Sequence, residues 1–149
     1  MYQSLNLMDQ MKVTQMDLKE RIKDQINSLE LPVKLYLGYI DGKHSPELRL
    51  QALPNSRVIE EDYGGNKTEQ LFMEIAMRGD DEGMINQVLW QIADVLGNND
   101  YGVVSKDGSF IFNKLDIVSF PQPTMADTSG EVTYVLDFKV TVDTFNEKG

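Results

Sequence analysis

Few side chains in this sequence could perform nucleophilic or metal-assisted chemistry, and they are scattered. The one histidine, His44, lies in a turn-like segment, residues 41–46, with no second histidine to form a metal-binding pair and no nucleophile motif beside it. An exposed loop histidine is the simplest interpretation. The chain has no cysteine, which excludes a thiolate nucleophile and a cysteine zinc site.

Two acidic runs offer carboxylates that could hold a cation. Residues 60–62 (Glu-Glu-Asp) fall on a predicted strand, where neighbouring side chains point to opposite faces and do not converge. Residues 80–82 (Asp-Asp-Glu) are better explained as the start of a helix, where acidic groups favour the dipole. Neither run has the ligand spacing of a calcium loop. We therefore expect no metal and no cofactor.

The glycine-rich segment 64–68 (Gly-Gly-Asn-Lys-Thr) superficially resembles a phosphate loop. It lacks the phosphate-loop spacing, and a strand rather than a helix follows it, so a hairpin turn is the better interpretation. No nucleophile elbow or dinucleotide fingerprint is present. We therefore expect a protein that is not an enzyme. A small-ligand-binding α+β module, or an enzyme using Asp and Glu, stays an alternative that requires a concave polar pocket.

Charge and length narrow the class of protein further. The formal net charge is −10 with a pI near 4.5, which disfavours direct nucleic-acid binding because such binding depends on neutralising phosphates. No apolar run reaches the roughly 18 residues that a membrane span needs, so no membrane association is expected. The length of 149 residues predicts one domain over residues 1–149.

Apolar periodicity predicts two helices. Apolar residues spaced three and four apart predict a long helix over residues 4–30, which Pro32 would stop. A second stripe predicts a helix over residues 80–96, with Asp80 as its N-cap. Trp90 lies beside this stripe, as either partly buried core or an interface anchor. Met8, Met11, Met73, Met77 and Met84 lie on predicted apolar faces, where core packing is favoured and an interface role stays open.

Alternation predicts the strands. Residues 33–78 are interpreted as strands at 33–40 and 48–52, followed by a hairpin with arms at 57–63 and 68–78. Residues 109–145 predict two long strands, the first ending near residue 120 with a β-bulge near Asn113 or Lys114, because the apolar parity changes there. A loop is expected over residues 121–130. The predicted fold class is α+β, a mainly antiparallel sheet with both helices packed on it.

Three features resemble a known family over about residues 1–145. These are Leu53-Pro54 followed by a glycine-containing hairpin, the strand from Phe72 to Arg78, and the final Tyr-Val-Leu-Asp-Phe strand, residues 134–138. The chain resembles the tail-terminator and minor capsid (head–tail joining) proteins of long-tailed bacteriophages. The resemblance implies a structural subunit that forms a ring, with a hexamer expected. The ring would cap the tail tube and join it to the head–neck proteins.

The resemblance also implies where the protein is located. Proteins of this family have no catalytic residues that could be assigned to this sequence. The subunit would be in the host bacterial cytoplasm during assembly and in the tail or neck of the mature virion. Another neck, minor capsid or baseplate module is the alternative within the same class. A ring needs two different complementary patches, and two predicted loops are candidates, although a surface loop without function is equally open. The candidate residues are Asp62, Tyr63, Gly64, Gly65, Asn66 and Lys67 in one loop and Gln122, Thr124 and Met125 in the other.

Overall fold

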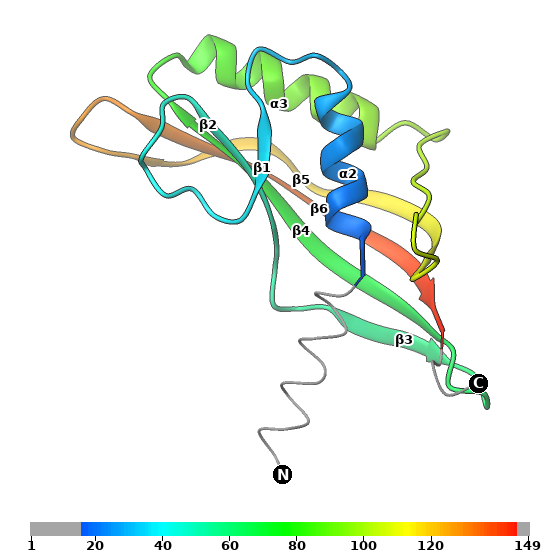
Figure 1. Ribbon diagram of the computed structural model, residues 1–149. Helices are drawn as coiled ribbons and strands as arrows, with labels where there is room; N and C mark the ends of the chain where they lie inside the picture. Colours follow the sequence, from blue (N-terminus) through cyan, green and yellow to red (C-terminus); the bar gives the residue numbers. More distant parts are fainter. Residues whose placement is uncertain (1–15, 146–149) are drawn as a thin grey trace.

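Two helices lie on one side of a six-stranded sheet in residues 16–145, the part of the chain that this computed structural model describes (Figure 1). The strand order is β1-β2-β4-β6-β5, and β3 pairs with β4 beyond the end of β2. Only β1 and β2 are parallel; the other pairs are antiparallel. The elements are α2 (Leu18–Asn27), β1 (Leu35–Leu37), β2 (Glu47–Ala52), β3 (Arg57–Glu61), β4 (Lys67–Gly79), α3 (Glu82–Leu96), β5 (Ile111–Ala126) and β6 (Val132–Thr144).

Strands β4 and β6 form the centre of the sheet and pair along their whole length. Apolar and polar side chains alternate on both, so one face of the sheet is apolar and the other carries charged groups such as Glu74, Asp137 and Lys139. The apolar face meets the helices and forms the core. Its buried members on these strands are Leu71, Met73, Ile75 and Met77 on β4, and Tyr134, Leu136, Phe138, Val140 and Val142 on β6.

Helix α3 covers β4, β5 and β6 with an apolar stripe that includes Ile85, Leu89 and Ile92, all fully buried. Its N-cap is Asp81, whose carboxylate accepts a hydrogen bond from the Met84 backbone N–H at 3.1 Å. The prediction of Asp80 as the cap is therefore one residue early. The predicted helix over residues 80–96 is otherwise found at Glu82–Leu96.

The prediction of one long helix over residues 4–30 is wrong. Helix α2 spans Leu18–Asn27, and Met16 and Asp17 before it are not helical. The Asp17 carboxylate instead accepts hydrogen bonds from Ser105 Oγ at 2.7 Å and the Lys106 N–H at 2.8 Å. At the other end, Glu30 takes a φ of 57°, which no helix continues through. Residues 4–15 lie outside the described residues.

The predicted α+β class is therefore corrected as well. Strands hold far more of the described residues than the helices do, and they form one sheet with two helices on one face. The predicted strand over residues 33–40 is reduced to Leu35–Leu37, because Gly38 turns the chain with a φ of 109°. Neither described helix is long and apolar enough to cross a membrane. That residues 1–149 form one domain stays a prediction.

Strand β5 confirms one prediction and overturns another. The pairing register with β6 shifts between Phe112 and Lys114, which confirms the predicted bulge. The expected loop over residues 121–130 is wrong, because β5 continues through Pro121 and Pro123 to Ala126. Proline is tolerated here because β5 is the outermost strand, so a missing backbone N–H leaves no neighbour unpaired. The turn that remains covers residues 127–131.

Candidate interaction surface

The strand edges of the sheet differ in whether their backbone groups are already paired. At β1, the Asn27 side chain of α2 takes the place of a further strand. Its Oδ1 accepts a hydrogen bond from the Leu35 N–H at 2.8 Å, and its Nδ2 donates to the Leu35 carbonyl at 3.0 Å. This edge is blocked, which is a common way to prevent unwanted strand pairing.

Strand β3 has an open edge. It pairs with β4 on one side, and no backbone hydrogen bond found within residues 16–145 joins its other side to another segment. All five of its side chains are exposed, including Val58 and Ile59, which are 45% and 49% accessible. Figure 1 shows that β3 lies beyond the region that the helices cover. The strand is therefore accessible on both faces and along one edge.

The turn at the end of β3 holds the first group of predicted contact residues. The Asp62 carboxylate accepts hydrogen bonds from the Gly64 and Asn66 N–H groups at 2.9 and 3.0 Å, and these bonds hold its pKa below the usual value, led by that from Asn66. Gly65 has a φ of 86°, which favours glycine. Tyr63 is fully exposed at the tip. This ordered turn presents an aromatic ring to solvent.

Strand β5 is the second open edge, on the opposite side of the sheet. Only its first residue, Ile111, has an outer neighbour, in a bridge to Val104, and no other outer backbone pairing is found within residues 16–145. Large apolar side chains along β5 are exposed. They are Ile111 (55%), Val118 (54%), Phe120 (54%) and Met125 (68%). A long edge strand with exposed apolar groups readily pairs with another chain.

Trp90 and Phe120 extend this second surface onto the helix layer. Their rings stack with centroids 5.5 Å apart and planes 13° apart, and both remain about half exposed, Trp90 at 44%. Trp90 is thus partly buried, as both alternatives for it allow, and its role as an interface anchor stays a prediction. Phe120 was missed in the sequence, because the register shifts around it hide which face its side chain occupies. Exposed aromatic side chains are favoured anchors of protein interfaces.

The methionines divide differently. Met73 and Met77 are buried in the core, and Met84 packs against it, which confirms the favoured interpretation for these three. Met8 and Met11 lie outside the described residues. Met125, by contrast, is 68% exposed on β5.

The two predicted contact groups are far apart. Gln122, Thr124 and Met125 are strand residues near the β6 positions Val135 and Thr133, whereas the 62–67 turn lies at the opposite end of β4. The two groups lie nine residues apart along the strands, a distance of about 30 Å. Gln122 donates to Ser119 Oγ at 2.8 Å and Thr124 to the Thr133 carbonyl at 3.2 Å. The structure therefore places these residues on two separate surfaces.

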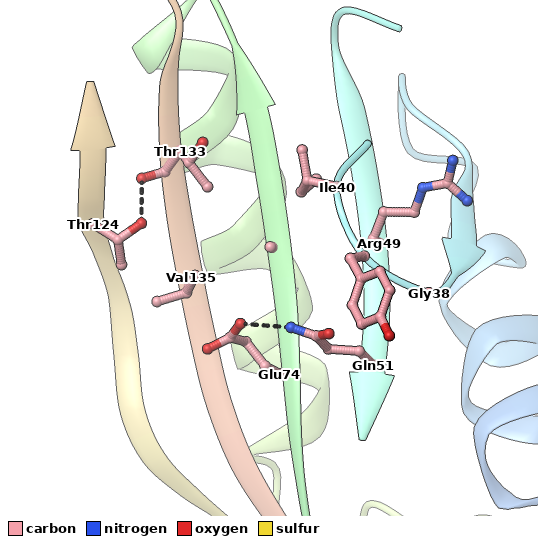
Figure 2. Close-up of a pocket in the computed structure, with 10 residues that line it drawn as sticks. Gly38, Ile40, Arg49, Gln51, Glu74, Thr124, Thr133 and Val135 are labelled. Carbon is pink, nitrogen blue, oxygen red and sulfur yellow. Dashed lines mark hydrogen bonds between the residues drawn. The ribbon is translucent and has the colours of Figure 1, made fainter. Parts of the chain in front are cut away.

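A pocket of about 330 Å³ lies on the helix-free face (Figure 2). Its charged groups already have partners: Glu74 accepts a hydrogen bond from Gln51 at 3.1 Å, and Arg49 is bonded to Glu47 at 2.9 Å and Asp41 at 3.3 Å. The residues that line it are Gly38, Tyr39, Ile40, Arg49, Gln51, Glu74, Ala76, Thr124, Thr133 and Val135.

Asp137 lies opposite Glu74 on the neighbouring strand, on the same face. Burial, together with the Glu74 carboxyl group beside it, raises the pKa of Asp137 to about 7. Its Oδ1 atom is buried and has no hydrogen-bond partner in the described part of the chain. Among residues 16–145, no group of three or more His, Cys, Asp or Glu side chains is arranged to hold a metal ion. His44 is exposed in its loop.

Comparison with solved structures shows chains of similar fold. No protein-family model matches this chain, and no curated protein matches it. A chain in the solved virion of a native gene transfer agent particle has a similar fold, with a TM-score of 0.51 and 12% sequence identity. The match covers 79% of this chain and 84% of the other. At this identity the likeness concerns the fold.

Proposed function

We propose that this protein is a structural subunit of a phage-like virion, a tail terminator that forms a ring on the tail tube and joins it to the head–neck proteins. It acts by assembly and not by catalysis. Its fold is similar to that of a chain in a gene transfer agent virion. The sequence resemblance to tail-terminator proteins supports the same class.

One observation carries the proposal: the sheet ends in two open edges that differ from each other. The β3 edge lies on one side of the sheet and the β5 edge on the other, while the β1 edge is blocked by Asn27. A ring is built from head-to-tail contacts, so each subunit must offer two different complementary surfaces on opposite sides. This arrangement meets that requirement. A hexamer, as the family resemblance implies, is the proposed ring.

The aromatic and apolar groups fit this use. Trp90 and Phe120 lie at the β5 edge, and Val58 and Ile59 lie on β3. Interfaces draw much of their binding energy from a few such anchors. The tip of the hairpin, with Tyr63 exposed, is proposed as a contact for the tail tube or the head–neck proteins. The protein would occupy the host cytoplasm during assembly and the virion afterwards.

Electron microscopy of the purified chain tests the proposal. Closed rings of one size are expected, and the rings should bind the end of tubes made from the tail tube protein of the same virus and stop their growth. Rings that do not bind tail tubes but do bind a neck or baseplate protein would support the alternative, another neck, minor capsid or baseplate module. A chain that forms no ring and binds no virion protein would contradict both.

The pocket on the helix-free face favours a second candidate, a small-ligand-binding module. Glu74, Gln51 and Thr133 give it polar groups at one place. Its charged lining groups are already bonded within the chain, so it fits a small neutral polar ligand better than a charged one. Thermal-shift screening with neutral polyols and amides tests this candidate. Stabilisation that Gln51→Ala abolishes would support it, and no stabilisation would remove it.

A further inference from the structure

Four charged side chains lie on the two open edges, on the same face of the sheet. On β3, Arg57 pairs with Gln70 of β4 and Glu60 pairs with Thr68. On β5, Lys114 pairs with Thr141 of β6 and Asp116 with Lys139. All of these partners alternate with the core residues of β4 and β6, so the four charges share the helix-free face.

A bulge in β3 sets the spacing of its charges. The register with β4 shifts between Val58 and Glu60, so Ile59 is the extra residue. Arg57 and Glu60 therefore lie on the same face of the sheet, and one residue on the helix side, Val58, lies between them. Lys114 and Asp116 have the same separation on β5, because that strand is regular from Lys114 to Ile117. Val58 and Leu115 are the residues between, and both point to the helix side.

The strand directions in a ring also match. Subunits of a closed ring keep the same orientation relative to the ring axis, so the β5 edge of one copy would meet the β3 edge of the next. Each step across β3, β4, β6 and β5 is antiparallel, so β5 runs opposite to β3. The β3 strand of the next copy would thus run antiparallel to β5, with its helix-free face on the same side.

We propose that β5 of one copy pairs antiparallel with β3 of the next copy, with Lys114 opposite Glu60 and Asp116 opposite Arg57. Val58 then lies opposite Leu115 on the helix side. This inference rests on the proposed ring and names its interface. Both charge pairs are attractive, and opposite charges across strands stabilise a pairing.

The neighbouring registers are disfavoured by the same four charges. Shifting β3 along β5 by two residues in one direction places Arg57 opposite Lys114. Shifting it by two residues in the other direction places Glu60 opposite Asp116. Each of these puts like charges directly across from each other, which destabilises strand pairs. The charge pattern therefore selects one register and excludes the two beside it.

The charged groups are accessible for this contact. The side chains of Lys114 and Asp116 are 63% and 44% exposed, and their own ion pair is 3.8 Å long. Glu60 is exposed on β3. Arg57 makes a hydrogen bond through Nε to Gln70 at 3.0 Å, which still leaves the other guanidinium nitrogens as possible donors.

Charge reversal tests the interface in the full-length chain. Lys114→Glu and Glu60→Lys should each weaken self-association about tenfold or more, since each replaces an attractive pair by a repulsive one. The double variant K114E/E60K should restore association to near the wild-type level. An equimolar mixture of the two single variants should also assemble, because each chain then meets a complementary neighbour. Sedimentation velocity over a range of concentrations measures all four.

The control is Lys43→Glu, the same charge change on an exposed loop residue away from both open edges. It should assemble like the wild type, and circular dichroism should show that every variant is folded. If the wild type forms rings but both single variants assemble equally well, the pairing is wrong and the ring stands. A wild type that never associates overturns the pairing and the ring together.

Discussion

Strands β2 and β3 pair with the same edge of the same strand, β4, yet their side chains have opposite surroundings. Leu48 and Leu50 of β2 are fully buried beneath α2, whereas every side chain of β3 is exposed. The two strands thus share the same neighbour but differ in burial, and β2 is also paired with β1 on its other side. Because buried apolar area supplies most of the folding free energy, we infer that the helix-covered half of the sheet holds the fold together. The β3 half is available for contacts with other molecules.

Truncating each strand in turn gives the largest expected contrast. Leu50→Ala should lower the free energy of unfolding by about 2–5 kcal/mol, since it removes a fully buried side chain. Val58→Ala on β3 should change it by no more than about 0.5 kcal/mol while weakening self-association. Urea unfolding measures the change in stability of the two variants. Equal losses of stability would contradict the division of the sheet.

Opening the blocked β1 edge should have the next largest effect. Asn27→Ala removes both hydrogen bonds to the Leu35 backbone and should cost about 1–3 kcal/mol of unfolding free energy, because two backbone groups lose their partners. Asn27→Asp separates the two bonds, since its carboxylate can accept from the Leu35 N–H but cannot donate to the Leu35 carbonyl. If Asn27→Ala is as stable as wild type in urea, Asn27 does not protect this edge.

The carboxyl group of Asp137 should make stability depend on pH. Its pKa is raised from 3.8 to about 7, so the folded state binds a proton more tightly than the unfolded chain, and the resulting stability is lost as the pH rises from about 4 to above 7. Asp137→Asn should therefore stabilise the protein more at pH 8 than at pH 4. The difference in its effect on the unfolding free energy between these two pH values should be about 1–2 kcal/mol, after allowance for solvent screening. Parallel pH profiles for the two proteins would contradict this account.

Breaking the stacked aromatic pair should alter stability less than the changes at Leu50, Asn27 and Asp137. Trp90→Ala breaks the contact with Phe120 and should cost about 0.5–1.5 kcal/mol of unfolding free energy. Its effect on self-association should be larger, because both rings are half exposed at the β5 edge. Trp90→Phe should keep most of both properties. Thermal unfolding and sedimentation velocity, run on the same samples, separate the two effects.

Alternating patterns predicted the parts of this fold that depend on local sequence. The hairpin arms and the β6 strand could be predicted because alternating apolar residues mark one face of a strand. The bulge near Asn113 could be predicted because a change of apolar parity marks a shift of register. Helix α2 was overextended, because a periodic stripe does not show that Asp17 is used to bind Ser105 and Lys106, far away in the chain.

The course of β5 and the surfaces it carries could not be predicted in the same way. Prolines at 121 and 123 are typical of loops, and only the position of β5 at the edge of the sheet makes a strand possible there. The stacking of Trp90 on Phe120 joins a helix to a strand across an irregular register. Such contacts depend on tertiary packing, which no spacing in the sequence encodes.

The mass of the native assembly tests the central claim most directly. Native mass spectrometry of the full chain over a range of concentrations should show one closed oligomer, a hexamer, beside the monomer, with no open series of sizes. The charge-reversed K114E variant should shift this equilibrium toward the monomer. A monomer at every concentration, unchanged by the tail tube protein of the same virus, would contradict the account.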